Sequence, residues 1–209
     1  MPSEPLTRLT STLTSLLPEI SHPPTFLTPR WTFSTPPASS PLPSALVSYA
    51  EYLSTRLPPL DDNTEVSYIP IVEGSDPCPW EICLFYIPPS KSIPLHDHPD
   101  MLVYSVPLAD TLKCVQTSAP SLSRYLFPPP LIPSTPPSGS VLLASPGEDN
   151  LHSFEAGEDE GCAILDVVVP GYIEGRECTY YGVGEGGRLV NLGEDAGPRV
   201  VTLELDGVE

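Results

Sequence analysis

The chain has 209 residues, with 9 lysines and arginines against 27 aspartates and glutamates, and a formal net charge of −18. This acidity argues against nucleic acid and anionic membranes as partners, because both require a basic surface. The length fits one domain, or one domain with an extension. The 30 prolines exclude a mainly helical protein, because proline breaks helix interiors and is kept out of central strands.

Targeting signals and cysteine usage bear on the compartment. No apolar run approaches the roughly 20 residues that span a bilayer. The opening Met-Pro-Ser-Glu-Pro-Leu lacks a basic stretch followed by an apolar one, so no secretory signal is expected. The five cysteines are odd in number and form no Cys-x-x-Cys pair, which favours reduced thiols. We therefore expect a cytoplasmic protein, with a nuclear pool as an addition.

The first part of the chain is predicted to be helical. Leucines recur at helical spacing over residues 6–17 and predict a helix that Pro18 ends. A connection rich in Pro, Ser and Thr follows. A second helix is predicted to start with Ser44 as its N-cap and to end at Pro58. Residues 1–60 are thus expected to form a helical, proline-rich extension packed on the rest of the protein.

Residues 61–209 are predicted to form an all-β domain. Short β-rich runs divided by Pro, Gly and Asp favour a sandwich or barrel over alternating βαβ units. A stretch rich in Pro and Ser, residues 118–138, predicts an inserted surface loop of polyproline character. The predicted strands are Glu65–Ile71, Glu81–Ile87, Met101–Val106, Thr111–Thr117, Ser140–Ala144, Leu151–Phe154, Cys162–Val169, Cys178–Tyr181 and Val200–Leu205.

Three histidines form a candidate metal site. His96 and His98 stand at i and i+2 in Pro-Leu-His-Asp-His-Pro, and on a strand such residues point to one face. His152 lies on another predicted strand and is the candidate third ligand. The competing interpretation is that His96 and His98 are loop residues before a proline. The fourth histidine, His22, precedes two prolines and is predicted to be exposed.

The ligand set alone does not identify the metal. Three imidazoles suit Zn²⁺ activating a water molecule, and equally Fe²⁺ binding substrate and O₂. Because neutral ligands leave a dication its full charge, such a site favours an anionic ligand such as a thiolate. The local chemistry therefore permits either hydrolysis or oxidation.

Several further motifs stand in order along the chain. They are Ile93–Met101, Asn150–Phe154, Ala163–Val167, Pro170–Tyr172 and Gly175–Tyr181. Together they resemble the plant cysteine oxidase and cysteamine (2-aminoethanethiol) dioxygenase family. The resemblance covers residues 5–182, with gaps at the two proline-rich stretches.

The resemblance implies a cupin fold, or double-stranded β-helix, that holds non-haem Fe(II) through His96, His98 and His152. It implies a dioxygenase that uses O₂ to convert the N-terminal cysteine of peptides or proteins to cysteine sulfinic acid, an oxygen-sensing reaction that feeds a degradation signal. By the same resemblance, Asp166 supports the site or binds the substrate amine. Tyr172 lines the substrate entrance. Cys178 and Tyr180 form an active-site pair that in some members is joined by a thioether bond.

Each of these roles has a structural alternative. Asp166 lies in an apolar run and is alternatively a structural carboxyl, while Tyr172 is alternatively a turn residue. Cys178 and Tyr180 alternatively pack in the core. For the whole chain, the alternatives are a cysteamine dioxygenase that makes hypotaurine and a metal-binding cupin without catalytic activity. Nothing in the sequence demands an oligomer, so a monomer is expected.

The chain departs from the family pattern mainly by added negative charge. Asp100 stands where the family commonly has glycine, and Glu148-Asp149 replaces a usual Gly-Gly. From Ser145 onward the chain carries 15 of its 27 acidic residues but only three of its nine basic ones. If this charge surrounds the site, it favours cationic substrates by electrostatic steering.

Overall fold

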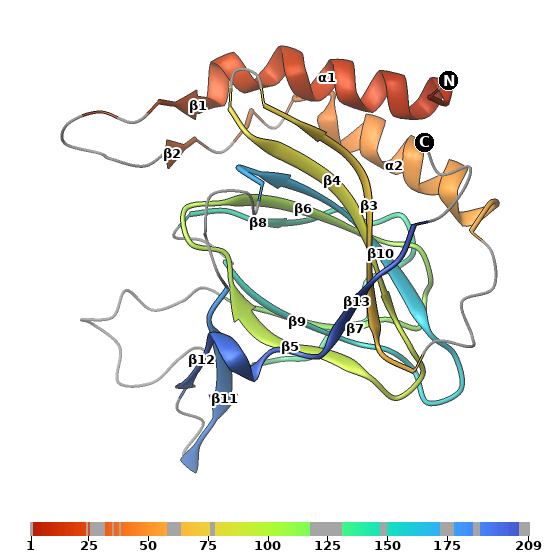
Figure 1. The fold of residues 1–209 in the computed structure, drawn as a ribbon, viewed down its shortest axis with the longest axis vertical. Coiled ribbons are helices and arrows are strands. Elements are labelled where there is room, and N and C mark those ends of the chain that lie inside the picture. The colour runs from red at the N-terminus through yellow and green to blue at the C-terminus, as the bar shows by residue number, and fades with distance from the viewer. Residues whose placement is uncertain are drawn as a thin grey trace.

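The protein is built around two facing β-sheets with two helices on the outer side of one of them (Figure 1). The computed structural model describes residues 2–23, 25, 32–34, 36–37, 39–57, 64–75, 78–117, 131–146, 150–171, 178–185 and 189–204. The larger sheet has the strand order β13-β3-β4-β10-β6-β8, and the smaller sheet β12-β11-β5-β9-β7. Apart from the parallel pair of β13 and β3, the paired strands are antiparallel. This arrangement is a double-stranded β-helix, and the predicted all-β cupin fold is confirmed.

The strands lie at or near the predicted β-rich runs, with the two exceptions named below. The larger sheet consists of β3 (Val66–Gly74), β4 (Trp80–Ile87), β6 (Leu102–Pro107), β8 (Leu142–Ala144), β10 (Cys162–Val169) and β13 (Val200–Thr202). The smaller sheet consists of β5 (Ser92–Asp97), β7 (Lys113–Thr117), β9 (Leu151–Glu155), β11 (Tyr180–Val183) and β12 (Leu189–Gly193). A short 3₁₀ turn, η3 (Glu194–Ala196), follows β12. Strands β5 and β12 were not among the predicted runs.

The two helices, α1 (Glu4–Ile20) and α2 (Leu42–Ser54), pack against each other and against the larger sheet. Their apolar faces join one hydrophobic cluster with the outward side chains of β3, β4, β6 and β10. The buried positions of α1 are Leu6, Leu9, Leu13, Leu16, Leu17 and Ile20. A small pair of strands, β1 (Ser21–His22) and β2 (Thr32–Phe33), follows α1.

The predicted helix boundaries were wrong in three places. The helix α2 ends at Ser54, short of the predicted end at Pro58, and residues 55–56 form a turn instead. Pro18 lies inside α1, which continues to Ile20 because Leu17 and Ile20 are buried and outweigh one missing hydrogen bond. Ser44 is not an N-cap: α2 already begins at Leu42, since prolines fit a first turn that needs no backbone N–H partner. The Ser44 hydroxyl instead donates to the Pro41 carbonyl at 3.0 Å.

Strand β10 places one polar side chain inside the protein. Its residues are buried on both faces. Ala163, Leu165 and Val167 face the helix-covered cluster, whereas Ile164 and Val168 belong to the clusters of the other face. Because strand side chains alternate, Asp166 faces the space between the two sheets.

Three sequence-based expectations concern membrane spans, disulfides and the proline-rich stretch. No helix in the described ranges is long and apolar enough to cross a membrane. All five cysteines lie in the described part of the chain, and none of them forms a disulfide there. Of the proline-rich stretch 118–138, the structure describes residues 131–138, where Ser134 and Cys114 of β7 exchange backbone hydrogen bonds of 2.7 and 2.8 Å.

Candidate metal centre

The three predicted ligands, His96, His98 and His152, converge in the structure. His96 of β5 and His152 of β9 are direct cross-strand partners. His98 lies just beyond the end of β5, where its backbone N–H donates to the Asn150 carbonyl at 3.2 Å. The three ring centroids are 4.6 to 4.8 Å apart, and one ligand atom from each histidine lies within 4.8 Å of the others. The prediction that these residues cluster is confirmed.

The ring nitrogens are arranged as ligands of one ion. The Nε2 atoms of His98 and His152 are 2.8 Å apart. Two metal–nitrogen bonds of about 2.1 Å that meet at a right angle end about 3.0 Å apart, close to this separation. The Nδ1 of His96 lies 2.8 Å from the Pro94 carbonyl oxygen. Because a carbonyl only accepts, Nδ1 carries the proton and Nε2 keeps its lone pair for a metal.

The surroundings keep the three imidazoles neutral. His96, His98 and His152 are buried. Burial lowers the pKa of His96, although the Pro94 carbonyl and Asp97 oppose this effect. Burial lowers the pKa of His98 and of His152 well below the usual value, and neighbouring histidines lower both further. At pH 7 all three rings are therefore in the unprotonated form that binds metal, and the residues present fit a metal ion.

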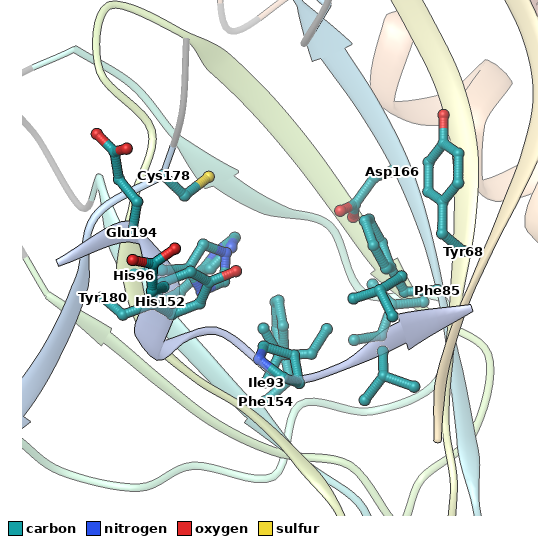
Figure 2. A pocket seen from close by; sticks show the side chains of 15 residues that line it. Tyr68, Phe85, Ile93, His96, His152, Phe154, Asp166, Cys178, Tyr180 and Glu194 are labelled. Atoms are coloured by element: carbon teal, nitrogen blue, oxygen red, sulfur yellow. The ribbon is translucent and has the colours of Figure 1, made fainter. Parts of the chain in front are cut away.

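A cavity of about 620 Å³ opens beside the histidines (Figure 2). His96, His152, Cys178 and Tyr180 gather on one side of it, and Asp166 lies on the other side. The apolar part of its lining includes Val66, Phe85, Ile93, Phe154 and Ile164. The predicted pair Cys178 and Tyr180 therefore faces the same space as the metal centre. Whether the two side chains are cross-linked stays a prediction.

Asp166 is a buried carboxyl turned into this cavity. The residue is 4% exposed, and its Oδ1 atom has no hydrogen-bond partner among the described residues. Burial, reinforced by the charge of Glu81 and opposed by the Ser105 hydroxyl, raises the pKa of Asp166 to about 7. A cationic group entering the pocket would supply the partner that this oxygen lacks.

A second buried carboxyl, Glu81, lies on β4, the strand that pairs with the strand of Asp166, β10. The hydroxyl of Tyr68, another lining residue, donates to Glu81. Burial and this hydrogen bond raise the pKa of Tyr68. Sequence reasoning did not single out Glu81. Like Asp166, it is a charged residue within an apolar strand, and this pattern was its signal in the sequence.

Asp97 stands between His96 and His98 in the sequence, and its side chain forms two hydrogen bonds to residues 179–181, which follow Cys178. Its carboxylate accepts hydrogen bonds from the Thr179 backbone N–H at 2.7 Å and from the Tyr181 hydroxyl at 2.8 Å. Tyr180 pairs in register with His96, and their ring centroids are 5.6 Å apart. Sequence reasoning missed Asp97, whose signal was its place inside the histidine motif.

The other residues that the sequence singled out lie in different places. Tyr172, Glu148 and Asp149 fall outside the described residues, so their predicted places stay predictions. Asp100 has a φ of 56°, a left-handed conformation that glycine adopts without cost, and it is not among the residues that line the cavity. His22 is exposed, as predicted, and its Nε2 lies 2.8 Å from the Ser34 hydroxyl.

The chain is similar to several known proteins. A probable 2-aminoethanethiol dioxygenase of Dictyostelium discoideum is 31% identical in an alignment over 136 residues that covers 61% of this chain and 60% of that protein. Plant cysteine oxidase 2 of Arabidopsis thaliana is 37% identical in an alignment over 111 residues that covers 49% of this chain and 40% of that protein. The 2-aminoethanethiol dioxygenase of Homo sapiens is 31% identical in an alignment over 159 residues that covers 63% of this chain and 55% of that protein. The chain thus spans 60% or less of the length of these relatives.

Solved structures and a family model extend the comparison. A Klebsiella pneumoniae protein with a double-stranded beta-helix domain has a TM-score of 0.41 and 18% identity, over 57% of this chain and 87% of that chain. The family model PCO_ADO matches residues 58–200, which is more than half of this chain and includes the three histidines. The chain therefore belongs to the PCO_ADO family.

Proposed function

We propose that the protein is a non-haem iron thiol dioxygenase that uses O₂ to convert the N-terminal cysteine of peptides or proteins to cysteine sulfinic acid. One observation carries the proposal: a buried cluster of three neutral histidines borders a cavity of about 620 Å³ that is also lined by Asp166, a buried carboxyl whose Oδ1 atom has no hydrogen-bond partner among the described residues. The relatives named plant cysteine oxidase and 2-aminoethanethiol dioxygenase support the same class of reaction.

Fe(II) is the metal that we propose for the site. His96, His98 and His152 would hold it, since their Nε2 atoms suit ligation at adjacent positions and leave other positions open. When bound, the iron supplies the redox chemistry that makes O₂ reactive toward sulfur.

The overall reaction is balanced without a further reductant. A thiol R–SH and one O₂ give the sulfinic acid R–SO₂H. The O–O bond breaks, two S–O bonds form, sulfur is oxidised and O₂ is reduced. The thiol proton is retained in the acid group of the product and passes to solvent at neutral pH.

The side chains of the pocket have separate tasks in this reaction. The Asp166 carboxylate accepts a charge-assisted hydrogen bond from the substrate ammonium and so orients the cysteine. Burial raises the pKa of Tyr180 to about 12, with a contribution from Cys178, so that its hydroxyl remains a hydrogen-bond donor at neutral pH. Ile93 and Phe154 give the pocket apolar walls that exclude water from the reacting sulfur.

The size of the cavity favours a peptide as substrate. Pockets of roughly 300–1,000 Å³ accommodate drug-sized molecules, and the cavity of about 620 Å³ lies within that range. Cysteamine is far smaller and would fill little of it. Cysteamine is nevertheless the second candidate, because two of the relatives above are named 2-aminoethanethiol dioxygenases.

The test is direct. Iron-loaded protein is incubated with isotopically labelled O₂ and either a cysteine-initiated peptide or cysteamine, and the products are analysed by mass spectrometry. We expect the peptide to gain two labelled oxygen atoms, and faster than cysteamine does. A serine-initiated peptide should gain none. If iron is bound and neither thiol gains oxygen, the proposal is wrong.

A further inference from the structure

The inner face of the larger sheet carries two buried carboxyls close together, those of Glu81 and Asp166. Glu81 is 3% exposed and lies on β4, two residues before Cys83, which is the cross-strand partner of Asp166 on β10. Because strand side chains alternate, all three point to the same face of the sheet. Glu81 and Asp166 are therefore diagonal neighbours on paired strands, an arrangement in which long side chains come within reach of each other.

A hydrogen bond holds the Glu81 side chain in place. The hydroxyl of Tyr68 on β3 donates to it, and the Tyr68 ring packs against Phe85 with the ring centroids 5.5 Å apart. Figure 2 shows Tyr68, Phe85 and Asp166 together on the side of the cavity opposite the histidines. Glu81 itself is not among the residues that line the cavity, so it would act on a ligand through its neighbours and not by touching it.

The charge of Glu81 bears on the protonation of Asp166. Burial is the main reason that the pKa of Asp166 is raised to about 7, and the charge of Glu81 raises it further. Two carboxyls in one buried place do not both ionise readily. A carboxyl with such a pKa is still about half protonated at pH 7.

Neighbouring groups on β3 and β4 do not supply a comparable charge. Burial raises the pKa of Tyr68 and of Cys83, so both stay protonated near neutral pH. Glu73, the cross-strand partner of Glu81, is exposed, and solvent screens its charge. Of the described residues of these two strands, Glu81 alone brings a buried charge close to Asp166.

The remaining titratable groups of the cavity lining lie on or near the smaller sheet. They are His96, His152, Cys178 and Tyr180 beside the metal centre, and Glu194 and Asp195 on η3. Figure 2 shows the two histidines, Cys178 and Tyr180 across the cavity from Asp166. The protonation of Asp166 is therefore governed chiefly on its own side of the cavity, by burial and by Glu81.

We propose that Glu81 is a positioning residue that acts through Asp166. Its charge, held in place by Tyr68, keeps a proton on the Asp166 carboxyl until a substrate binds, and the substrate ammonium then displaces that proton. The O–H bond of Asp166 breaks, the proton passes to solvent, and the carboxylate accepts a charge-assisted hydrogen bond from the ammonium. No oxidant or reductant takes part. The inference rests on the proposed function for the N-terminal ammonium as the group that enters.

The exchange predicts a measurable release of protons at pH 6. A carboxyl with a pKa of about 7 is about nine-tenths protonated there, so about 0.9 proton should leave for each peptide bound. If the charge of Glu81 is removed and the pKa of Asp166 falls by about one unit, about 0.5 proton should leave. The α-amino group of the peptide has a pKa of about 8 and contributes little at this pH.

Calorimetry measures this release without turnover. A serine-initiated peptide is titrated into the iron-loaded protein at pH 6 in two buffers of different ionisation enthalpy, and the difference in heat gives the protons released per peptide. The charge variant is Glu81→Gln, which keeps the size of the side chain and an oxygen that accepts from Tyr68. Its matched control is Glu73→Gln, the same change at the exposed cross-strand partner.

A second neutral variant guards against misfolding of the first. Glu81→Leu combined with Tyr68→Phe removes the charge together with its hydrogen-bond donor. Replacing both partners of a buried hydrogen bond by apolar groups of similar shape is nearly neutral for stability. Either Glu81 variant that folds therefore answers the question.

The unmodified protein and Glu73→Gln should release about 0.9 proton per peptide, and the Glu81 variants roughly half as much. Asp166→Asn should bind the peptide weakly and release none. Equal release by the unmodified protein and a folded Glu81 variant would overturn the inference. An equal fall in Glu73→Gln, full release by Asp166→Asn, or no release by the unmodified protein would also overturn it.

Oxidation assays with a cysteine-initiated peptide and cysteamine separate this inference from the proposed function. Proton release that depends on Glu81, without oxidation of any thiol, would support the inference and refute the proposed function. Oxidation of the peptide together with a release that is the same in the Glu81 variants would support the proposed function and overturn the inference.

Discussion

The carboxylate of Asp97 accepts a hydrogen bond of 2.8 Å from the hydroxyl of Tyr181, a residue 84 positions later in the chain. A second bond, from the Thr179 backbone N–H, ends on the other oxygen of the same carboxylate. Asp97 follows the metal-ligand candidate His96, and Tyr180 lies between the two bonded residues. One side chain thus links the histidine strand to the segment that carries Cys178 and Tyr180.

Removing this link should disturb the site without removing a metal ligand. Asp97→Ala breaks both hydrogen bonds and leaves the Tyr181 hydroxyl without its acceptor, so we expect a loss of stability of about 2 kcal/mol. We also expect kcat/KM for a cysteine-initiated peptide to fall about tenfold as Tyr180 loses its support. Tyr181→Phe breaks one bond and should show the smaller effect in both measurements. Equal effects of the two substitutions, or none, would contradict this role of Asp97.

Each of the three histidines should be necessary for both iron binding and activity. His96→Ala, His98→Ala and His152→Ala each remove one of three ligands, so each should lower both the bound iron per protein and the rate of thiol oxidation to near background. Iron content is measured by elemental analysis after gel filtration. His22→Ala removes an exposed histidine that contacts Ser34 and should retain both properties. Full iron content in His152→Ala would exclude it as a ligand.

The buried carboxyl of Asp166 should make stability depend on pH. Its pKa is raised to about 7 in the folded protein against 3.8 as the ordinary value. The unfolded chain therefore loses this proton first, and the contribution to stability falls as pH rises from about 4 to 7 and is constant above. Charging the folded form costs about 4 kcal/mol. Asp166→Asn removes the titration, so chemical denaturation at pH 5 and pH 8 should show a smaller pH-dependent loss than in the unmodified protein.

The same residue should shape the pH dependence of activity. If the ionised carboxylate holds the substrate ammonium, kcat/KM for peptides should rise as pH passes through about 7, where Asp166 loses its proton. Asp166→Asn should lower kcat/KM and abolish this rise. An unchanged pH profile in the variant would assign the rise to another group.

The close approach of Gly197 to the Tyr180 ring leads to a steric prediction. In Gly197→Ala the new methyl group would lie 2.6 Å from the Tyr180 ring, so one of them must move, at a cost of roughly 1–3 kcal/mol. We expect lower thermal stability and a lower kcat/KM for peptides. Gly157→Ala is the matched control, because its nearest atom is an ordinary 3.6 Å away. Similar losses in both variants would show that the contact with Tyr180 is not the cause.

Much of the candidate site could be predicted from patterns within single segments of the sequence. The i, i+2 spacing of His96 and His98 and the later His152 predicted a metal site from the residues themselves. The role of Asp166 was predicted from the resemblance to the family. Strand β5 itself was missed because Pro94 interrupts its pattern, and the sheet tolerates this with an irregular register between Ile93 and His96.

Contacts between segments far apart in the sequence could not be predicted from such patterns. The partners of Asp97 lie more than 80 residues away, and nothing in either segment indicates the other. The contact between Gly197 and Tyr180 depends on how the chain crosses from β12 in the smaller sheet to β13 in the larger one. The end of α1 beyond Pro18 was also unpredictable, because it depends on burial of Ile20 against the rest of the core.

The measurement that tests the central claim most directly is the stoichiometry of O₂ consumption against sulfinic acid formation. Iron-loaded protein is given a cysteine-initiated peptide in an oxygen electrode, and the product is quantified in the same sample. The account predicts one O₂ consumed for each sulfinic acid formed, and neither signal in His152→Ala. Oxygen consumption that yields only disulfide, or full sulfinic acid formation by His152→Ala, would contradict a thiol dioxygenase built on these three histidines.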